Sequence, residues 1–440
     1  MGAHPHRRLV VLDVAGLGWN LIEHRPDVIA RYGIALQPIE TVFPALTCPV
    51  QASFRTGVVP DGHGMVANGF YARRLARALF WEQSASLVFG DRIWRRFRAR
   101  GNRVAMLFWQ QSLGEEVDIV LSPRPIHRHH GGMIPDCQSQ PAEFYAKLCA
   151  ELGRPFPLDA YWGPRASLRS SEWITDAICY LLDDADTAPD LLLAYLPHLD
   201  YDQQRYGPND LITDHAVEET LRLVSRVWAG AREIEADVVI FGDYAMVPVT
   251  GHPIYPALAL RRAGLFQVRN VRGRLYPNFF DSRAVVLADH ELAVVYARDV
   301  DSARQARRVL EALDGVALLL DTDPGRVPAD RLPDRPDFIA VASEGRWMAY
   351  PWWEERHEEP DFAAHVDIHS KPGYDPCELL FGRWPWRIST DPTRIRGTHG
   401  RAGPTRLVAW ASTLTLQPAP DSVLDLSRRI EQWLNNDAPR

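Results

Sequence analysis

The sequence predicts an α/β protein with a central, mostly parallel sheet and a smaller α+β insertion. Over most of the 440 residues, short apolar runs alternate with longer helical patterns, which is the rhythm of βαβ units. Several of these runs end in Asp or another polar residue, as strands do where an open α/β sheet binds its ligand. From about Val268 to Glu344 the pattern changes to short strands around one helix, which indicates a separate unit set into the main domain.

The predicted strands of the main sheet are short runs of aliphatic and β-branched residues, a composition that favours buried parallel strands. They cover Leu9–Asp13, Arg103–Phe108, Leu191–Leu196 and Val238–Phe241. Helices are predicted over Ser171–Asp184 and Asp214–Glu235, and the second is long and amphipathic. This alternation predicts helices on both faces of the sheet.

The insertion is predicted to contain three strands and a helix. The strands cover Ala284–Ala288, Leu292–Ala297 and Gly315–Leu320, and the helix covers Asp301–Leu313. We therefore expect a catalytic core made of residues 1–267 and 345–440, with an α+β cap over residues 268–344. Such a cap is expected to lie over the strand ends and to shape the binding pocket.

Composition excludes several other classes of protein. Hydrophobic residues make up 46% and charged residues 24% of the chain, which excludes a disordered or fibrous protein. A net charge of −7 argues against a partner that is a nucleic-acid polymer. No apolar run is long enough to span a membrane or to form a signal-peptide core, and the five cysteines are scattered. We expect a cytoplasmic protein, and the sequence does not indicate its oligomeric state.

Two polar residues near the N-terminus stand where an open sheet would present them to a ligand. Asp13 ends the first predicted strand, and Thr47 lies in a loop directly before a helical pattern. A helix N-terminus favours anions, so a hydroxyl there is placed to meet an anionic substrate. The alternative for both residues is that they cap the helices that follow them.

Further polar residues follow at intervals along the chain. Asn68 lies in the glycine-dense loop Pro60–Phe70, and His399 lies in a Gly-Thr-His-Gly run. Asp200 and Asp243 each follow a predicted strand. Each signal is weak by itself. In this order and spacing, however, the residues resemble the alkaline phosphatase superfamily, and within it the nucleotide pyrophosphatase/phosphodiesterase branch, most specifically between Thr47 and Asn68.

This resemblance implies an alkaline-phosphatase-like sandwich fold and metal-dependent hydrolysis of small-molecule phosphate esters through a covalent threonine intermediate. It implies that Asp13, Thr47 and Asp243 hold the metal ion beside the nucleophile. It also implies that Asp200 and His399 belong to a second metal site. Coordination to a divalent cation is one way to deprotonate a threonine hydroxyl, which is otherwise a poor nucleophile near neutral pH.

The resemblance also assigns a role to Asn68, which would donate a hydrogen bond to a non-bridging oxygen of the substrate phosphate. Two other positions depart from the family pattern. Gln204 and Tyr244 stand where the family has histidine ligands. Amide and phenol oxygens change the affinity and the preference of a metal site. We therefore expect one or two divalent cations, with zinc, manganese and magnesium as the candidates.

Two histidines are candidates to replace the missing ligands. If the chain after Leu196 stays extended, His198, Asp200 and Asp202 point to one side. His369 would share a face with Asp367 in the same way. The alternative for His198 and His369 is a structural histidine held by hydrogen bonds.

Two further functions stay open beside hydrolysis. If an acceptor alcohol or amine replaces water, the same intermediate makes the chain a phosphoryl or related group transferase in specialised metabolism. With two imidazoles missing, the fold is also compatible with a non-catalytic homologue that only binds a phosphorylated ligand. Retention of the other site residues makes this the least favoured function.

Overall fold

The structure is a computed structural model that describes residues 7–129, 132–185, 187–322, 334–384 and 387–436. Its largest sheet has eight strands. From one edge to the other, these are β2 (Gln37–Ile39), β20 (Val408–Ser412), β11 (Asp237–Gly242), β1 (Leu9–Val14), β10 (Leu191–Leu196), β5 (Val104–Leu107), β6 (Ile119–Pro123) and β9 (Cys137–Gln140). The five strands from β11 to β6 run parallel, and β20 and β9 are antiparallel to their inner neighbours. The predicted α/β class with a mostly parallel central sheet is confirmed.

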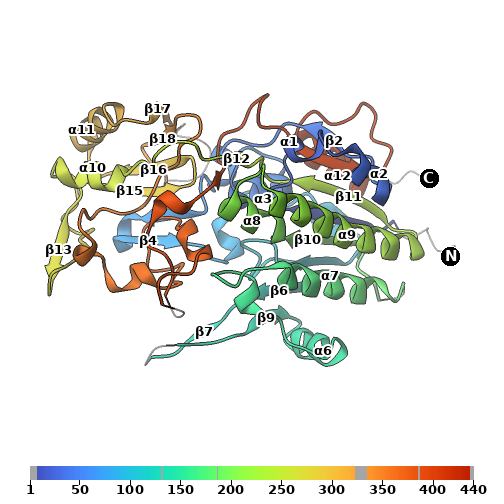
Figure 1. Ribbon diagram of the computed structural model, residues 1–440. Coiled ribbons are helices and arrows are strands. Elements are labelled where there is room, and N and C mark those ends of the chain that lie inside the picture. The colour runs from blue at the N-terminus through green and yellow to red at the C-terminus, as the bar shows by residue number, and fades with distance from the viewer. Residues whose placement is uncertain (1–6, 130–131, 186, 323–333, 385–386, 437–440) are drawn as a thin grey trace.

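Helices cover both faces of this sheet (Figure 1). Those in and around the main domain are α1 (Trp19–Ile22), α2 (Pro26–Tyr32), α3 (Thr47–Thr56), α4 (Pro60–His63), α5 (Arg95–Ala99), α6 (Phe144–Glu151), α7 (Leu168–Leu182), α8 (His198–Tyr206), α9 (Leu211–Glu233) and α12 (Val423–Asn435). One face packs on α7 and α9, and the other packs on α3, α5 and α12.

Strand β1 shows how this double burial explains the sequence. Every residue of β1 is buried, so the strand is apolar throughout instead of alternating. Val10 and Leu12 face α7 and α9, whereas Leu9 and Val11 face α3 and α12. Successive side chains of a strand point to opposite faces, so Asp13 belongs to the face on which α3 lies.

A second, antiparallel sheet lies beside the main one (Figure 1). Its strand order is β15 (Ala284–Asp289), β16 (Leu292–Ala297), β18 (Phe338–Ala342) and β17 (Val316–Asp321). Helices α10 (Pro256–Arg262) and α11 (Val300–Glu311) pack on one face of it, and the hairpin of β13 (Val268–Val271) and β14 (Arg274–Pro277) flanks it.

The other face of this smaller sheet packs on the segment that carries the predicted nucleophile. Val285, Leu287 and Leu292 share a buried cluster with Leu46 and Cys48, which flank Thr47. The small sheet is therefore docked on α3 and on the hairpin of β3 (Gly69–Ala72) and β4 (Arg77–Phe80). Its core on the helical side extends beyond residues 268–344, because α10 and Met348–Trp353 contribute to it. The domain boundaries themselves stay a prediction.

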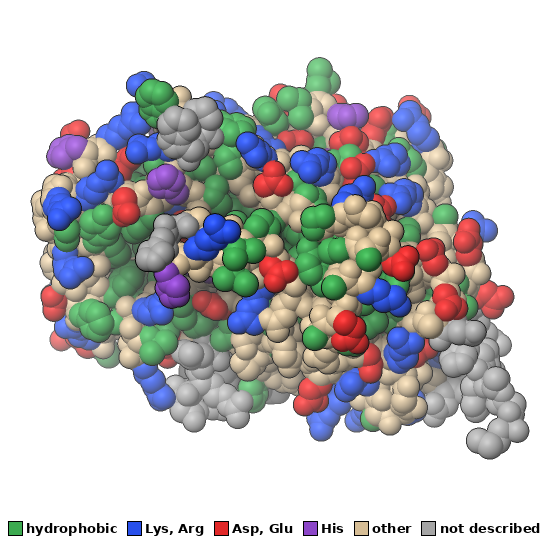
Figure 2. All heavy atoms as spheres, turned by 90° about the horizontal axis from the view of Figure 1, so that it is seen from below, with side chains coloured by type: hydrophobic (Ala, Val, Ile, Leu, Met, Phe, Trp, Pro, Cys, Tyr) green, Lys and Arg blue, Asp and Glu red, His purple; other side chains and the backbone are tan. Residues whose placement is uncertain are grey.

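The remaining short pairings are β7 (Ile126–His127) with β8 (Met133–Ile134), and β12 (Val247–Pro248) with β19 (Gly397–Thr398). Within the part of the chain that the structure describes, no helix is both long enough and apolar enough to cross a membrane. On the face drawn in Figure 2, acidic and basic side chains are interspersed instead of being gathered by sign. The five cysteines are all free thiols.

Candidate active site

Two carboxylates meet at the carboxyl edge of the main sheet. Asp13 is the fifth residue of β1, and Asp243 directly follows β11, which pairs in parallel with β1. The backbone N–H groups of Gly16 and Tyr244 donate to Asp243 Oδ1 at 3.0 and 2.9 Å. Gly16 has a φ of 67°, a conformation that favours glycine, and a Cβ there would approach the Gln203 side chain to 2.6 Å. The tight turn after β1 thus orients the Asp243 carboxylate.

Thr47 begins α3 beside these carboxylates. The N-cap of α3 is Leu46, whose own side chain makes no capping hydrogen bond, so Thr47 is not the cap. One turn later on the same helix, Gln51 Nε2 donates to Asp13 Oδ2 at 2.7 Å. Residues four apart lie on one helix face, so Thr47 is on the side of α3 that meets Asp13. Asp13 does not cap a helix either, because it lies within β1 and Gly18 is the N-cap of α1.

Each carboxylate keeps one oxygen without a hydrogen-bond partner. Asp13 Oδ1 and Asp243 Oδ2 are buried, and neither has a partner among the described residues. Burial raises the pKa of Asp13 despite the bond from Gln51, and burial with the nearby charge of Asp13 raises the pKa of Asp243. Two buried carboxylate oxygens close to α3, the helix that Thr47 begins, form a donor set that suits a hard divalent cation, which would offset this unfavourable burial. The residues of this half of the site fit one cation.

The second half of the site is arranged differently. Tyr244 Oη donates to Asp200 Oδ1 at 3.0 Å, and Gln204 Nε2 donates to Asp200 Oδ2 at 2.5 Å. Gln204 Oε1 in turn accepts a hydrogen bond from Tyr374 Oη at 2.9 Å. Both residues that stand in place of the expected histidines therefore donate a side-chain hydrogen bond to the Asp200 carboxylate. Burial still raises the pKa of Asp200, to about 7.

Four aromatic rings pack in a column beside Asp200, with the outer two pairs stacked and the middle pair tilted by 37°. The Tyr244 ring lies parallel to the His399 ring, with centroids 3.4 Å apart. His290 follows at 3.7 Å from His399, and Tyr374 follows at 4.1 Å from His290. His399 Nδ1 is 2.8 Å from the carbonyl oxygen of Ala45, so Nδ1 carries the proton and donates to it. Burial lowers the pKa of His399 to about 3, which keeps the ring neutral.

Asp200 and His399 are not arranged to hold a second cation. Both oxygens of Asp200 already accept hydrogen bonds, and the ring of His399 is packed between the rings of Tyr244 and His290. Within the described ranges, no group of three or more His, Cys, Asp or Glu side chains is arranged to hold a metal ion.

The expectation that the chain stays extended after Leu196 is wrong. Helix α8 begins at His198, directly after Pro197, because the chain must turn back at the end of a parallel strand. The three side chains therefore point in different directions. His198 Nε2 lies 3.4 Å from Glu219 on α9, and Asp202 pairs with Arg205 at 3.2 Å. Only Asp200 reaches the site, and the helical spacing of four places Gln204 beside it.

His369 also lies outside the cluster around Asp13 and Asp243. Its Nδ1 is 3.1 Å from the carbonyl oxygen of Phe80 at the end of β4. Asp367 accepts the backbone N–H groups of His369 and Ser370, which marks a turn instead of the expected extended stretch. The exposed His369 ring has the ring of His127 as a neighbour, with centroids 5.9 Å apart.

Asn68 lies next to the start of α3. Its Oδ1 accepts the backbone N–H of Cys48 at 3.0 Å, and Cys48 directly follows Thr47. Its Nδ2 donates to Asp289 Oδ1 at 3.2 Å, and its backbone N–H donates to Asp289 Oδ2 at 2.8 Å. The Asn68 amide is thus held at both ends.

The sequence did not point to the site residues that come from the smaller sheet and from the segment around Tyr374. Asp289 and His290 stand at the tip of the β15–β16 hairpin, and Tyr374 ends the ring column. One signal was present: ionisable residues occupy a short loop between two apolar strands, where glycine or asparagine is usual. Gln51 carried no such signal, because a glutamine in a helix is ordinary.

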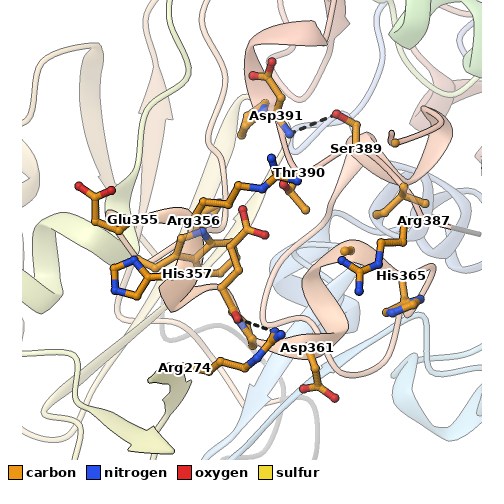
Figure 3. A pocket seen from close by; sticks show the side chains of 18 of the residues that line it. Arg274, Glu355, Arg356, His357, Asp361, His365, Arg387, Ser389, Thr390 and Asp391 are labelled. Carbon is orange, nitrogen blue, oxygen red and sulfur yellow. Dashed lines mark hydrogen bonds between the residues drawn. The ribbon is translucent and has the colours of Figure 1, made fainter. Parts of the chain in front are cut away.

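The large cavity of Figure 3 lies apart from these residues. Its volume is about 1090 Å³, and among the described residues that line it, none is a predicted site residue. Basic and acidic side chains surround it together, including Arg274, Arg356, Arg387 and Asp361. The candidate active site is therefore the buried cluster around Asp13 and Asp243.

Comparison with known proteins supports this assignment at the level of the family. The sequence profile of the Type I phosphodiesterase / nucleotide pyrophosphatase family matches residues 9–375. The chain belongs to this family. The matched segment contains every predicted site residue except His399. Family membership places the chain among the phosphoester hydrolases of the alkaline phosphatase superfamily and confirms the resemblance seen in the sequence.

Solved structures share the fold. Phosphonoacetate hydrolase from Sinorhizobium meliloti 1021, in complex with phosphonoformate, aligns with a TM-score of 0.62 and 18% identity over 98% of this chain and 96% of that one. Murine ectonucleotide pyrophosphatase / phosphodiesterase 5 aligns with a TM-score of 0.54 and 13% identity over the same shares of both chains. No curated protein sequence matches the chain. At these identities the two structures show a common fold.

Proposed function

We propose that the chain is a phosphodiesterase or nucleotide pyrophosphatase that depends on one divalent cation and uses Thr47 as its nucleophile. The observation that supports this most directly is the pair of buried carboxylate oxygens without partners, Asp13 Oδ1 and Asp243 Oδ2, beside the helix that Thr47 begins. Asp13 and Asp243 would hold the cation with the Thr47 hydroxyl. The bound cation would lower the pKa of that hydroxyl and offset the charge of the phosphate.

The residues of the chain would act in two displacements. Thr47 Oγ1 attacks phosphorus in line with the leaving alcohol or phosphate, which departs with the proton that the hydroxyl gives up. Water then attacks the phosphothreonine, the bond between Thr47 Oγ1 and phosphorus breaks, and the hydroxyl is restored. Two inversions give net retention at phosphorus. Asn68 would bind a non-bridging oxygen, and the N-terminus of α3 favours the negative charge that the phosphate brings.

The choice of cation follows from the donor atoms. Carboxylate and hydroxyl oxygens favour magnesium and manganese, whereas zinc prefers sites with imidazole or thiolate. Among the described residues, no histidine joins Asp13 and Asp243 in a group that could hold a metal ion. We therefore expect one tightly bound ion, magnesium or manganese, and a small-molecule phosphate ester as substrate.

Elemental analysis together with a substrate screen tests this function. The purified chain is stripped with a chelator, reloaded separately with magnesium, manganese or zinc, and assayed with chromogenic phosphate mono- and diesters. We expect about one ion per chain and turnover of diesters with magnesium or manganese. Asp243→Asn serves as the matched control, because it keeps the size of the side chain and removes its charge. Two tightly bound zinc ions in the resting protein would contradict the proposal.

The same screen separates the other functions. Release of the phosphoryl group to an added alcohol or amine in preference to water would make the chain a group transferase. Absence of turnover with every cation, together with binding of inorganic phosphate, would make it a ligand-binding homologue.

A further inference from the structure

The tip of the β15–β16 hairpin has an unusual composition for its geometry. Asp289 pairs with Leu292, so the loop between the strands consists of His290 and Glu291 alone. His290 has a φ of 57°, and two-residue hairpin loops normally place glycine, asparagine or aspartate in that conformation. A histidine there is strained, and such strain persists only where the surrounding structure holds the residue in place.

The surroundings of the tip supply this restraint. The His290 ring lies between His399 and Tyr374, stacked on Tyr374 and tilted against His399. The backbone N–H of Glu291 donates to the carbonyl oxygen of His399 at 2.8 Å. The Glu291 carboxylate is 3.3 Å from Arg406 on the opposite side. The hairpin of the smaller sheet is therefore anchored in the wall of the active site.

This anchor presents Asp289 to Asn68. The orientation of the Asn68 amide follows from chemistry: the N–H of Cys48 can only donate, so it meets Oδ1, and the Asp289 carboxylate accepts from Nδ2. Nδ2 has two hydrogens and uses one for Asp289. The direction of its second hydrogen is thereby set relative to Thr47, which precedes Cys48.

We propose that Asp289 is a positioning residue of the reaction, which holds the Asn68 amide so that its second N–H meets a phosphate oxygen. This inference rests on the proposed function, because it assigns Asn68 to the phosphate. It also means that the smaller sheet supplies part of the active site. Asp289 itself does not touch the substrate and acts only through Asn68.

A positioning role has a definite kinetic signature. A misplaced donor affects the transition state more than the bound substrate, because the geometry of the oxygens changes during the displacement. We expect Asp289→Ala to lower kcat about 10- to 100-fold and to change KM by less than about threefold. Asp289→Asn keeps one acceptor for the two donors of Asn68, so its kcat should lie between that of Asp289→Ala and that of the wild type.

A double-mutant cycle with Asn68→Ala tests whether Asp289 acts through Asn68. If it does, adding Asp289→Ala to Asn68→Ala causes no further loss, whereas independent effects would multiply. Asp337→Ala is the matched control on the same sheet. It removes a carboxylate that accepts the backbone N–H of Ala297 at 2.7 Å and pairs with Arg73, and it should lower the melting temperature without this change in kcat.

The outcomes separate this inference from the proposed function. Wild-type turnover together with an unchanged kcat in Asp289→Ala, or multiplicative losses in the cycle, would overturn the role of Asp289 alone. If Asp289→Ala does not fold, the cycle with Asp289→Asn decides. If the wild type binds inorganic phosphate without turning over esters, the same cycle is read from phosphate affinity measured calorimetrically with magnesium. A wild type that neither hydrolyses esters nor binds phosphate would overturn the proposed function itself.

Discussion

The two halves of the active site differ in whether their carboxylate oxygens already have partners. On the Thr47 side, Asp13 and Asp243 each keep one buried oxygen free of hydrogen bonds within the described residues. On the other side, both oxygens of Asp200 accept bonds from Tyr244 and Gln204. Burial raises the pKa of the carboxyl groups in both halves, so burial alone does not distinguish them.

The difference shows how buried carboxylate oxygens can be satisfied without a cation. Phenol and amide groups satisfy Asp200 by hydrogen bonds, and the stacked rings fill the volume beside His399. A buried polar network is stable when each member has its partners. The Thr47 half lacks such partners, which is why it fits a cation. The following predictions test this contrast.

The largest effect is expected in the half of the site around Asp13 and Asp243, at the proposed nucleophile Thr47. Thr47→Ala removes the attacking oxygen and should lower kcat by a factor of about 1000 or more, since loss of a nucleophile is among the most damaging changes in an enzyme. Steady-state kinetics with a chromogenic diester measures it, and circular dichroism checks that the fold is intact. A variant that keeps more than about a tenth of the wild-type kcat, a loss below about 1.4 kcal/mol, would exclude Thr47 as the nucleophile.

The next prediction compares a carboxylate from each half. Asp243→Asn should weaken binding of the tightly bound cation by about 100-fold or more, because it removes a charged ligand. Asp200→Asn should change that affinity by less than about fivefold, because Asp200 is already saturated by neutral donors. Titration calorimetry with magnesium or manganese measures both. Equal losses in the two variants would show that the halves do not differ as described.

The third prediction concerns the half of the site around Asp200. The double variant Gln204→His, Tyr244→His breaks the hydrogen bonds to Asp200 and introduces two imidazoles beside His399. We expect the zinc content to rise from about one to about two ions per chain, since imidazole ligands favour zinc. Elemental analysis after dialysis against zinc measures the stoichiometry. The single variant Gln204→Asn, which adds no imidazole, is the control and should stay near one. An unchanged zinc content in the double variant would mean that the ring column alone excludes the ion.

The smallest effect concerns how stability depends on pH through Asp200. Burial raises the pKa of Asp200 from 3.8 to about 7. A carboxyl group with a raised pKa in the folded state contributes stability that is present below its unfolded pKa and is lost as the pH rises through its folded pKa. In chelator, the melting temperature of the wild type should therefore fall relative to Asp200→Asn between about pH 4 and pH 7, by a few degrees. A difference that stays constant across this range would contradict the raised pKa.

The sequence predicted most of the framework because its signals are local. Strand Leu191–Leu196 agrees with the prediction residue for residue, and the helices α7 and α9 differ from it by a few residues at their ends. Buried parallel strands require continuous apolar runs, and long helices require amphipathic periodicity, so both can be read along the chain. The failure after Leu196 came from a short segment, where the turn into α8 depends on the return of the chain across the sheet.

The sequence by itself determined the family, the parallel core and the order of the candidate residues from Asp13 to His399. It also identified Gln204 and Tyr244 as departures from the family pattern. Only the tertiary structure decided what these departures do, because their partners lie far away in the chain: Tyr244 bonds Asp200, Gln204 bonds Tyr374, and Asp289 holds Asn68 across 221 positions. Hydrogen bonds and ring stacking act over a few ångströms in space. The types of residue and their spacing along the chain do not determine distances in space between remote residues. The packing of the two sheets determines these distances.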